Sequence, residues 1–211
     1  MTHREYEMHG GIASEHRFQL FDEPESRVEG VARFLYSGWQ GGGPLLVVAR
    51  PLHWALIQAR LEANGCPVSA LIAEGRLIAL DAATTLASFL DDGQDTPNPV
   101  LFYKHIGTMV SRLSKRGRLH AYGEMADVLA EQARFSAAHG VEILWEQLGA
   151  RESFTLLCGY ASAHFGDPRD ATSLRRICRT HTCVHADASD LLGTWLLNDR
   201  QSRYHTQEVA R

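Results

Sequence analysis

Residues 45–49 of the chain, Leu-Leu-Val-Val-Ala, form a continuously apolar run that is followed at once by Arg50 and Pro51. A short apolar run without alternation predicts a β-strand that is covered on both faces, as strands are in a parallel sheet. Pro51 suits the first position of a helix, because the N–H that proline lacks would have no partner there. This strand–turn–helix unit indicates an α/β fold.

Short apolar runs and helical periods alternate on both sides of this unit. A strand is predicted within residues 16–21, and the segment after it repeats apolar residues at three- and four-residue spacing as far as Trp39, which predicts a helix. Later strands are predicted at residues 77–81, 119–122, 154–160 and 182–185, with helices between them. This order predicts a three-layer α/β sandwich, in which a mostly parallel sheet is flanked by helices.

Bulk properties exclude several classes of protein. The 211 residues are enough for one domain with a full core, and the formal net charge of -4 gives no general attraction to nucleic acid or anionic membranes. No apolar run approaches the roughly 20 residues that span a bilayer, and the first residues lack the apolar core of a secretory signal. The four cysteines form no CxxC pair, so a reducing, cytoplasmic location is expected.

The chain is expected to have three parts. Residues 1–14 form a polar N-terminal tail, residues 15–186 form the folded domain, and residues 187–211 form a C-terminal extension. Leu191, Leu192 and Trp195 supply that extension with apolar side chains for an additional helix.

Seven motifs occur along the domain in a characteristic order. They are His16-x-x-x-x-Phe21, Leu45–Ala49 with the following Arg50-Pro51, Gly75-Arg-Leu-Ile-Ala-Leu-Asp81-Ala, Gly123-Glu124-Met125, Val141-Glu-Ile-Leu-Trp145-Glu, Phe154-Thr-Leu-Leu-Cys158-Gly-Tyr160 and Ile177-Cys178-Arg-Thr-His181. Together they resemble the MEDS domain family, which is named for methanogens, methylotrophs and the dichloromethane regulator. The resemblance covers about residues 15–186.

The resemblance implies both a fold and a role. It implies a RecA-like domain of the circadian-clock ATPase type that has lost its nucleotide chemistry and that senses small molecules. Members are usually joined to DNA-binding or histidine-kinase modules, whereas the residues after 186 are too few for such a module. We therefore expect the domain to signal through a partner protein.

The turn after the first predicted strand argues against nucleotide hydrolysis. A phosphate-binding loop would need the pattern G-x-x-x-x-G-K-[S/T] there, so that backbone N–H groups and a lysine surround the phosphates. Residues 21–27 are instead Phe-Asp-Glu-Pro-Glu-Ser-Arg, with three carboxylates and neither glycine nor lysine. Those carboxylates complement the helix dipole and would repel a triphosphate. We expect a degenerate P-loop, no enzyme activity and no cofactor.

Polar residues follow the ends of successive predicted strands. In an open α/β sheet, ligands bind beyond the carboxyl ends of the strands, so a ligand crevice is predicted at this edge. The predicted ligand-binding residues are Asp22, Arg50, Asp81, Glu124 and Tyr160. The alternatives are that Asp22 and Asp81 only cap helices, that Arg50 pairs with a carboxylate, and that Glu124 only begins the next helix.

Four residues near the C-terminal end of the domain are candidates for a metal or thiol site. They are Cys158, Cys178, His181 and Cys183. Cys178 and His181 would share one helix face at i, i+3 spacing, which permits joint coordination. The opposing interpretation is that these are small buried cysteines, since zinc sites usually have more tightly paired ligands.

The leading hypothesis is a sensory or regulatory domain that binds a small-molecule signal. It would act through a partner such as a histidine kinase or a transcription regulator, and a homodimer is compatible with this role. One alternative is a scaffolding module without a ligand. Another is an unrecognised enzyme that uses Glu124 with His105, His120 or Cys158, although no nucleophile elbow or HExxH motif is present. Direct nucleic-acid binding is not expected, because the basic cluster at 112–118 fits a solvated helix end.

Overall fold

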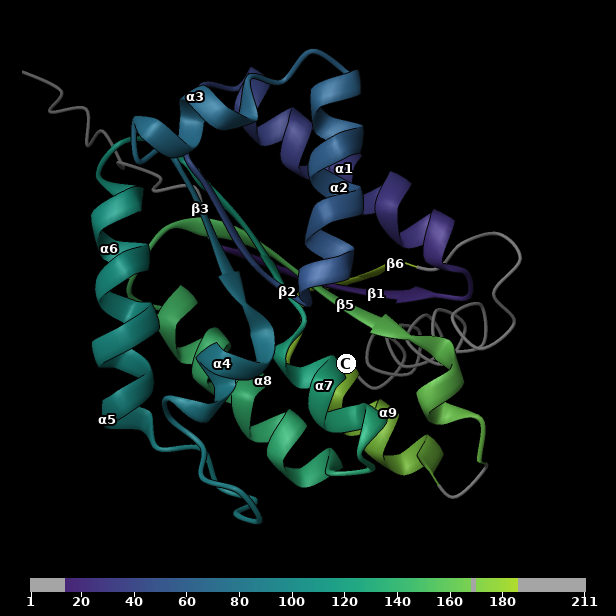
Figure 1. The fold of residues 1–211 in the computed structure, drawn as a ribbon. Helices are drawn as coiled ribbons and strands as arrows, with labels where there is room; N and C mark the ends of the chain where they lie inside the picture. Colours follow the sequence, from purple (N-terminus) through teal and green to yellow (C-terminus); the bar gives the residue numbers. More distant parts are fainter. Residues whose placement is uncertain (1–13, 168–169, 186–211) are drawn as a thin grey trace, which may run out of the picture.

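The structure is a computed structural model that describes residues 14–167 and 170–185. Its centre is a six-stranded parallel sheet with the order β3-β2-β4-β5-β1-β6 (Figure 1). The strands are β1 (Glu15–Phe21), β2 (Leu45–Ala49), β3 (Leu77–Asp81), β4 (Leu119–Gly123), β5 (Phe154–Ala161) and β6 (Cys183–His185). The central strands β2 and β5 are buried almost throughout, as the continuous apolar runs predicted.

Helices cover both faces of the sheet and confirm the predicted three-layer α/β sandwich (Figure 1). One face is covered by α1 (Pro24–Gln40), α2 (Pro51–Ala63) and α3 (Val68–Ala73). The other is covered by α4 (Ala82–Ala87), α5 (Pro99–Phe102), the π-helix η1 (Tyr103–Gly107), α6 (Thr108–Ser114), α7 (Met125–Glu131), α8 (Phe135–Gly149) and α9 (Ala171–Cys178). A short 3₁₀ helix, η2 (Ser162–Phe165), follows β5.

The path of the chain through the sheet creates a natural crevice. After β1 the chain crosses to β2 with α1 on one face, and after β3 it returns through β4 and β5 with its helices on the other face. Such a reversal of direction separates the loops at the carboxyl ends of the strands, and ligands in open α/β sheets bind there. The ends of β1, β2, β4 and β5 therefore border this crevice.

One predicted helix differs in detail from its sequence pattern. A single helix with one buried stripe is predicted by the three- and four-residue spacing of Val100, Tyr103, Ile106, Val110 and Leu113. The π-helix η1 interrupts this helix between α5 and α6. A π-turn inserts an extra residue into the helical repeat and so rotates the apolar stripe. Ile106, Val110 and Leu113 are fully buried, whereas Val100 is 74% exposed, so its predicted burial is wrong.

Two further predictions concern the ends of the chain and membranes. The predicted polar tail, the extension at 187–211 and its Leu191, Leu192 and Trp195 lie outside the described residues, apart from Ser14. Within the described residues, no helix has the length and apolarity to cross a bilayer.

Candidate functional site

A cavity of about 280 Å³ opens at the carboxyl ends of the strands. Its lining comes from the segments that follow β1, β2, β4 and β5. The lining residues are Phe21, Asp22, Glu23, Pro24, Arg27, Arg50, His53, Asp127, Glu131, Ala161 and His164. The cavity therefore occupies the crevice that the chain reversal creates.

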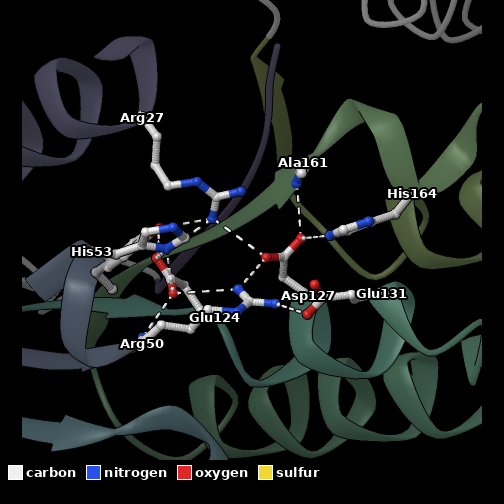
Figure 2. Close-up of polar contacts among 9 residues, drawn as sticks. Arg27, Arg50, His53, Glu124, Asp127, Glu131, Ala161 and His164 are labelled. Carbon is white, nitrogen blue, oxygen red and sulfur yellow. Dashed lines mark hydrogen bonds and ion pairs between the residues drawn. The ribbon is translucent and has the colours of Figure 1, made fainter. Parts of the chain in front are cut away.

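Two helix starts supply the charged side chains between the strand ends. Arg50 precedes α2 in an extended conformation, and His53 lies in the first turn of that helix. Glu124 immediately precedes α7, and Asp127 lies in the first turn of that helix. In each pair the i, i+3 spacing directs both side chains to the same side, so α2 and α7 present their polar residues to one another (Figure 2).

Glu124 is fully buried and accepts hydrogen bonds on both carboxylate oxygens. The backbone N–H of Arg50 donates to Oε2 at 2.9 Å, and the Tyr122 hydroxyl donates to Oε1 at 2.7 Å. Nδ1 of His53 lies 2.9 Å from Oε1. Burial alone would raise the pKa of Glu124, but the His53 hydrogen bond and the charge of Arg27 outweigh it and lower the pKa.

Asp127, also buried, joins three strand ends. Its Oδ1 accepts from the backbone N–H of Ala161 at 2.8 Å and lies 3.3 Å from Nε2 of His164, and its Oδ2 accepts from Nη1 of Arg50 at 2.5 Å (Figure 2). Burial opposes ionisation, yet the hydrogen bond to His164 and the charges of Arg27 and Arg50 lower the pKa of Asp127 to about 2. The side chain is therefore an anion over the whole neutral range.

Two arginines balance these buried carboxylates. Arg27 is buried, with its guanidinium 5.2 Å from the centre of the Phe21 ring and its Nη1 3.5 Å from oxygens of both Glu124 and Asp127. Arg50 also reaches outward and donates to Glu131 at 3.0 Å. Burial would lower the pKa of Arg27, but Tyr122, Asp127 and Glu124 raise it above its ordinary value, so the guanidinium stays charged.

Exposure separates the groups that can contact a ligand from those that cannot. The side chains of Arg50, His53 and His164 are 23%, 24% and 18% exposed, while those of Glu124 and Asp127 are 0% and 1% exposed. Within this network the partly accessible groups are thus nitrogen-based side chains held by inner carboxylates, and the exposed carboxylates Asp22, Glu23 and Glu131 stand at the rim of the cavity. The N–H groups of these side chains can donate hydrogen bonds to acceptor atoms.

The five ligand-binding residues predicted from the sequence divide into two groups. Asp22 and Arg50 line the cavity, and Glu124 forms the network behind it. Asp81 instead caps α4, where its Oδ1 accepts from the Thr84 N–H at 2.7 Å. Tyr160 is fully buried, and its hydroxyl donates to Glu142 in a separate cluster.

The alternative role of Asp22 as a helix cap is wrong. Glu23 holds the N-cap position of α1 without a side-chain cap bond, because the chain extends one residue further before the helix begins at Pro24. Asp22 Oδ1 accepts instead from the Ser162 hydroxyl at 2.5 Å, which joins the end of β1 to η2.

Several residues of the site were missed by the sequence analysis. They are Arg27, His53, Asp127, Glu131 and His164. The i, i+3 spacing of Arg50 with His53 and of Glu124 with Asp127 is the signal that could have found two of them. Arg27 and His164 carry no such signal, because only the parallel pairing of β1 with β5 brings their loops together.

The residues proposed as a metal or thiol site also separate. Cys158 and His181 lie together in a buried cluster with His16 and Glu142. In the part of the chain that is described, this cluster does not include Cys178, which is buried at the end of α9, or Cys183, which is partly exposed on β6.

A comparison with protein families identifies the family to which this sequence belongs. The sequence profile of the MEDS domain, the methanogen/methylotroph, DcmR sensory domain, matches residues 15–182. The chain belongs to the MEDS family. The matched range begins with β1 and includes every strand end that borders the cavity, so the network around Arg50 and Asp127 lies wholly within the MEDS domain. A comparison with curated proteins gives no match. MEDS is a family of sensory domains, which gives this chain a sensory or regulatory role.

Proposed function

We propose that the domain senses a small polar molecule in the cavity at the strand ends and passes the change to a protein partner, such as a histidine kinase or a transcription regulator. The observation that carries the proposal is the position of Arg50, which lines the cavity and also holds Asp127 and Glu131 of α7. A ligand that contacts Arg50 therefore acts directly on a second helix.

The volume of the cavity limits the size of the ligand. Ligand pockets for drug-sized molecules usually measure about 300–1,000 Å³, and the 280 Å³ here lies just below that range. The partly exposed nitrogens of Arg50, His53 and His164 favour a ligand with hydrogen-bond acceptors, such as a carboxylate or carbonyl oxygen. The rim carboxylates of Asp22 and Glu131 add acceptors for an amino or hydroxyl group.

Competition for Arg50 provides a route for the signal. A ligand acceptor that takes the outer hydrogen bond of Arg50 frees Glu131 at the end of α7 while the buried bond to Asp127 persists. Ligands shift a conformational equilibrium only through contacts that differ between the two states. The Arg50–Glu131 bond is such a contact, because it is exposed and can be exchanged at low cost.

Thermal-shift screening with small carboxylates, amino acids and hydroxy acids tests the proposal. A ligand at 100 times its dissociation constant stabilises the folded state by about 2.7 kcal/mol. The variant Arg50→Met should lose the ligand-induced shift, and Arg33→Met, which alters an exposed arginine on α1, should keep it. An equal shift in Arg50→Met would reject this cavity as the binding site. The absence of any shift across the screen would favour the scaffolding alternative.

A further inference from the structure

A second polar cluster lies on the side of the sheet that α8 and α9 cover, away from the cavity at the strand ends. It comprises His16 from β1, Glu142 from α8, Cys158 from β5 and His181, which follows α9. All four residues are buried, with exposed fractions between 0% and 7%. Four elements that are distant in sequence thus bring two imidazoles, a thiol and a carboxylate to one point in the core.

The distances within the cluster match the coordination shell of a metal ion. Glu142 Oε2 lies 3.1 Å from His16 Nε2, 3.2 Å from Cys158 Sγ and 3.4 Å from His181 Nε2. His16 Nε2 lies 3.3 Å from Cys158 Sγ, and all four atoms lie within 4.8 Å of one another. Bonds of about 2.0–2.3 Å to a tetrahedral ion require ligand atoms roughly 3.3–3.8 Å apart, so small adjustments would admit one ion.

The outer atoms of three of these side chains are already oriented by the protein. His16 Nδ1 lies 3.1 Å from the Thr180 carbonyl oxygen, and His181 Nδ1 lies 2.9 Å from that of Ile177. The Tyr160 hydroxyl donates to Glu142 Oε1, which leaves Oε2 facing the centre. Metal-binding histidines almost always donate their other N–H to a carbonyl or carboxylate, which fixes the tautomer that leaves a lone pair for the metal.

We propose that His16, Glu142, Cys158 and His181 bind one divalent transition-metal ion, for which Zn²⁺ has the best-matched chemistry. Two imidazole nitrogens, a thiolate and a carboxylate oxygen belong to the donor types that Zn²⁺ takes, and hard ions such as Mg²⁺ avoid sulfur. Four protein donors complete a tetrahedral shell, so the site is a closed, structural one. Binding displaces the proton of the Cys158 thiol, which passes to solvent.

The position of the cluster gives the ion an entry route and a consequence. His16 and Thr180 also line a cavity of about 420 Å³ between the start of β1 and the end of α8. The ion would join β1 to the segment after α9, and so would connect the two ends of the range that the MEDS profile matches. Metal occupancy would thereby control the folding of that edge, independently of any ligand in the cavity at the strand ends.

Metal analysis of the purified full chain tests this site. We expect about one equivalent of Zn²⁺ per chain by mass spectrometry of the metal content. After chelation, titration with Co²⁺ should produce the visible bands of a tetrahedral ion and a thiolate-to-cobalt charge-transfer band in the near ultraviolet. Wild-type protein that contains no metal and gives no such spectrum with Co²⁺ would overturn the proposal. This measurement requires no variant to fold.

Variants identify the ligands. Cys158→Ser should lose the charge-transfer band, while Cys66→Ser, which alters a buried cysteine in the other core, should keep it. Tyr160→Phe should keep the band but bind Co²⁺ about 10–100-fold more weakly, because the hydroxyl only positions Glu142. A band that survives in Cys158→Ser, or disappears in Cys66→Ser, would contradict the assignment of Cys158 as a ligand.

Discussion

Arg50 donates from Nη1 to Oδ2 of Asp127 at 2.5 Å, and so connects the end of β2 to the first turn of α7. Each partner also makes a second hydrogen bond within the network. The Arg50 backbone N–H donates to Glu124, and the Ala161 N–H donates to Asp127. One chain of charge-assisted hydrogen bonds therefore ties the ends of β2, β4 and β5. Removing one charge from such a chain leaves its partners buried and uncompensated.

Asp127→Asn should strongly destabilise the protein. Asparagine keeps the shape of the side chain and can still accept from Ala161, but it leaves Arg27, which is 4% exposed, short of one counter-charge. Breaking a buried ion pair typically costs about 3–5 kcal/mol, and we expect about 3 kcal/mol in urea unfolding. Asp92→Asn, in an exposed turn, is the matched control and should change stability by less than about 0.5 kcal/mol. Similar losses in the two variants would contradict the network.

The contribution of Asp127 should disappear in acid. Its pKa of about 2 in the folded state lies below its ordinary value of 3.8, so the folded state favours the anion. The stabilisation is thus complete above about pH 4 and is lost as the pH falls through about 2. We expect the difference in unfolding free energy between wild type and Asp127→Asn to shrink by about 2 kcal/mol over that window. A difference that does not change with pH would show that Asp127 ionises normally.

The strands were predictable because short apolar runs, which indicate buried strands, are local features of the sequence. Leu45–Ala49 and Leu77–Asp81 have the bounds that their apolar runs predict, and the last predicted strand is β6. The interruption by η1 was not predictable in this way. A π-turn depends on how the helix packs, and Val100, in the first turn of α5, is exposed.

The site was only partly predictable, for a physical reason. Position after a strand correctly located Arg50 and Glu124 near the crevice, because parallel strands end at one edge of the sheet. It could not say where a side chain points. Asp81 turns back to cap its own helix, and Tyr160 points into the core toward Glu142. The pairing of loops that brings His164 to Asp127 depends on strand order, which no local pattern contains.

Gly159→Ala should disturb the network from within β5. A Cβ atom there would lie 2.9 Å from both Phe21 Cε2 and the Tyr122 hydroxyl oxygen, which donates to Glu124. Forcing an added methyl group into a packed core costs about 1–3 kcal/mol, and we expect a loss in this range by urea unfolding. The control is Gly41→Ala, whose Cβ would meet only backbone oxygens at 3.5 Å with φ at -72°. Equal stability of the two variants would contradict the close packing around Gly159.

Nucleoside triphosphates should neither bind at the strand ends nor be hydrolysed. Asp22 and Glu23 stand at the cavity where a phosphate-binding loop would otherwise present N–H groups, and the 280 Å³ volume is small for a nucleotide. Glu124 is already occupied by Arg50, His53 and Tyr122, so directing a metal would require breaking these bonds.

The measurement compares wild type with Glu124→Gln in the presence of ATP and Mg²⁺. We expect phosphate release from both proteins to equal the buffer background, and ATP to cause no thermal shift in the wild type. Turnover in the wild type that the Glu124→Gln substitution abolishes would instead identify Glu124 as a catalytic group. In that case the hydrogen bonds that Glu124 accepts from the Arg50 N–H and the Tyr122 hydroxyl, and its contact with His53, would have to open when the nucleotide binds.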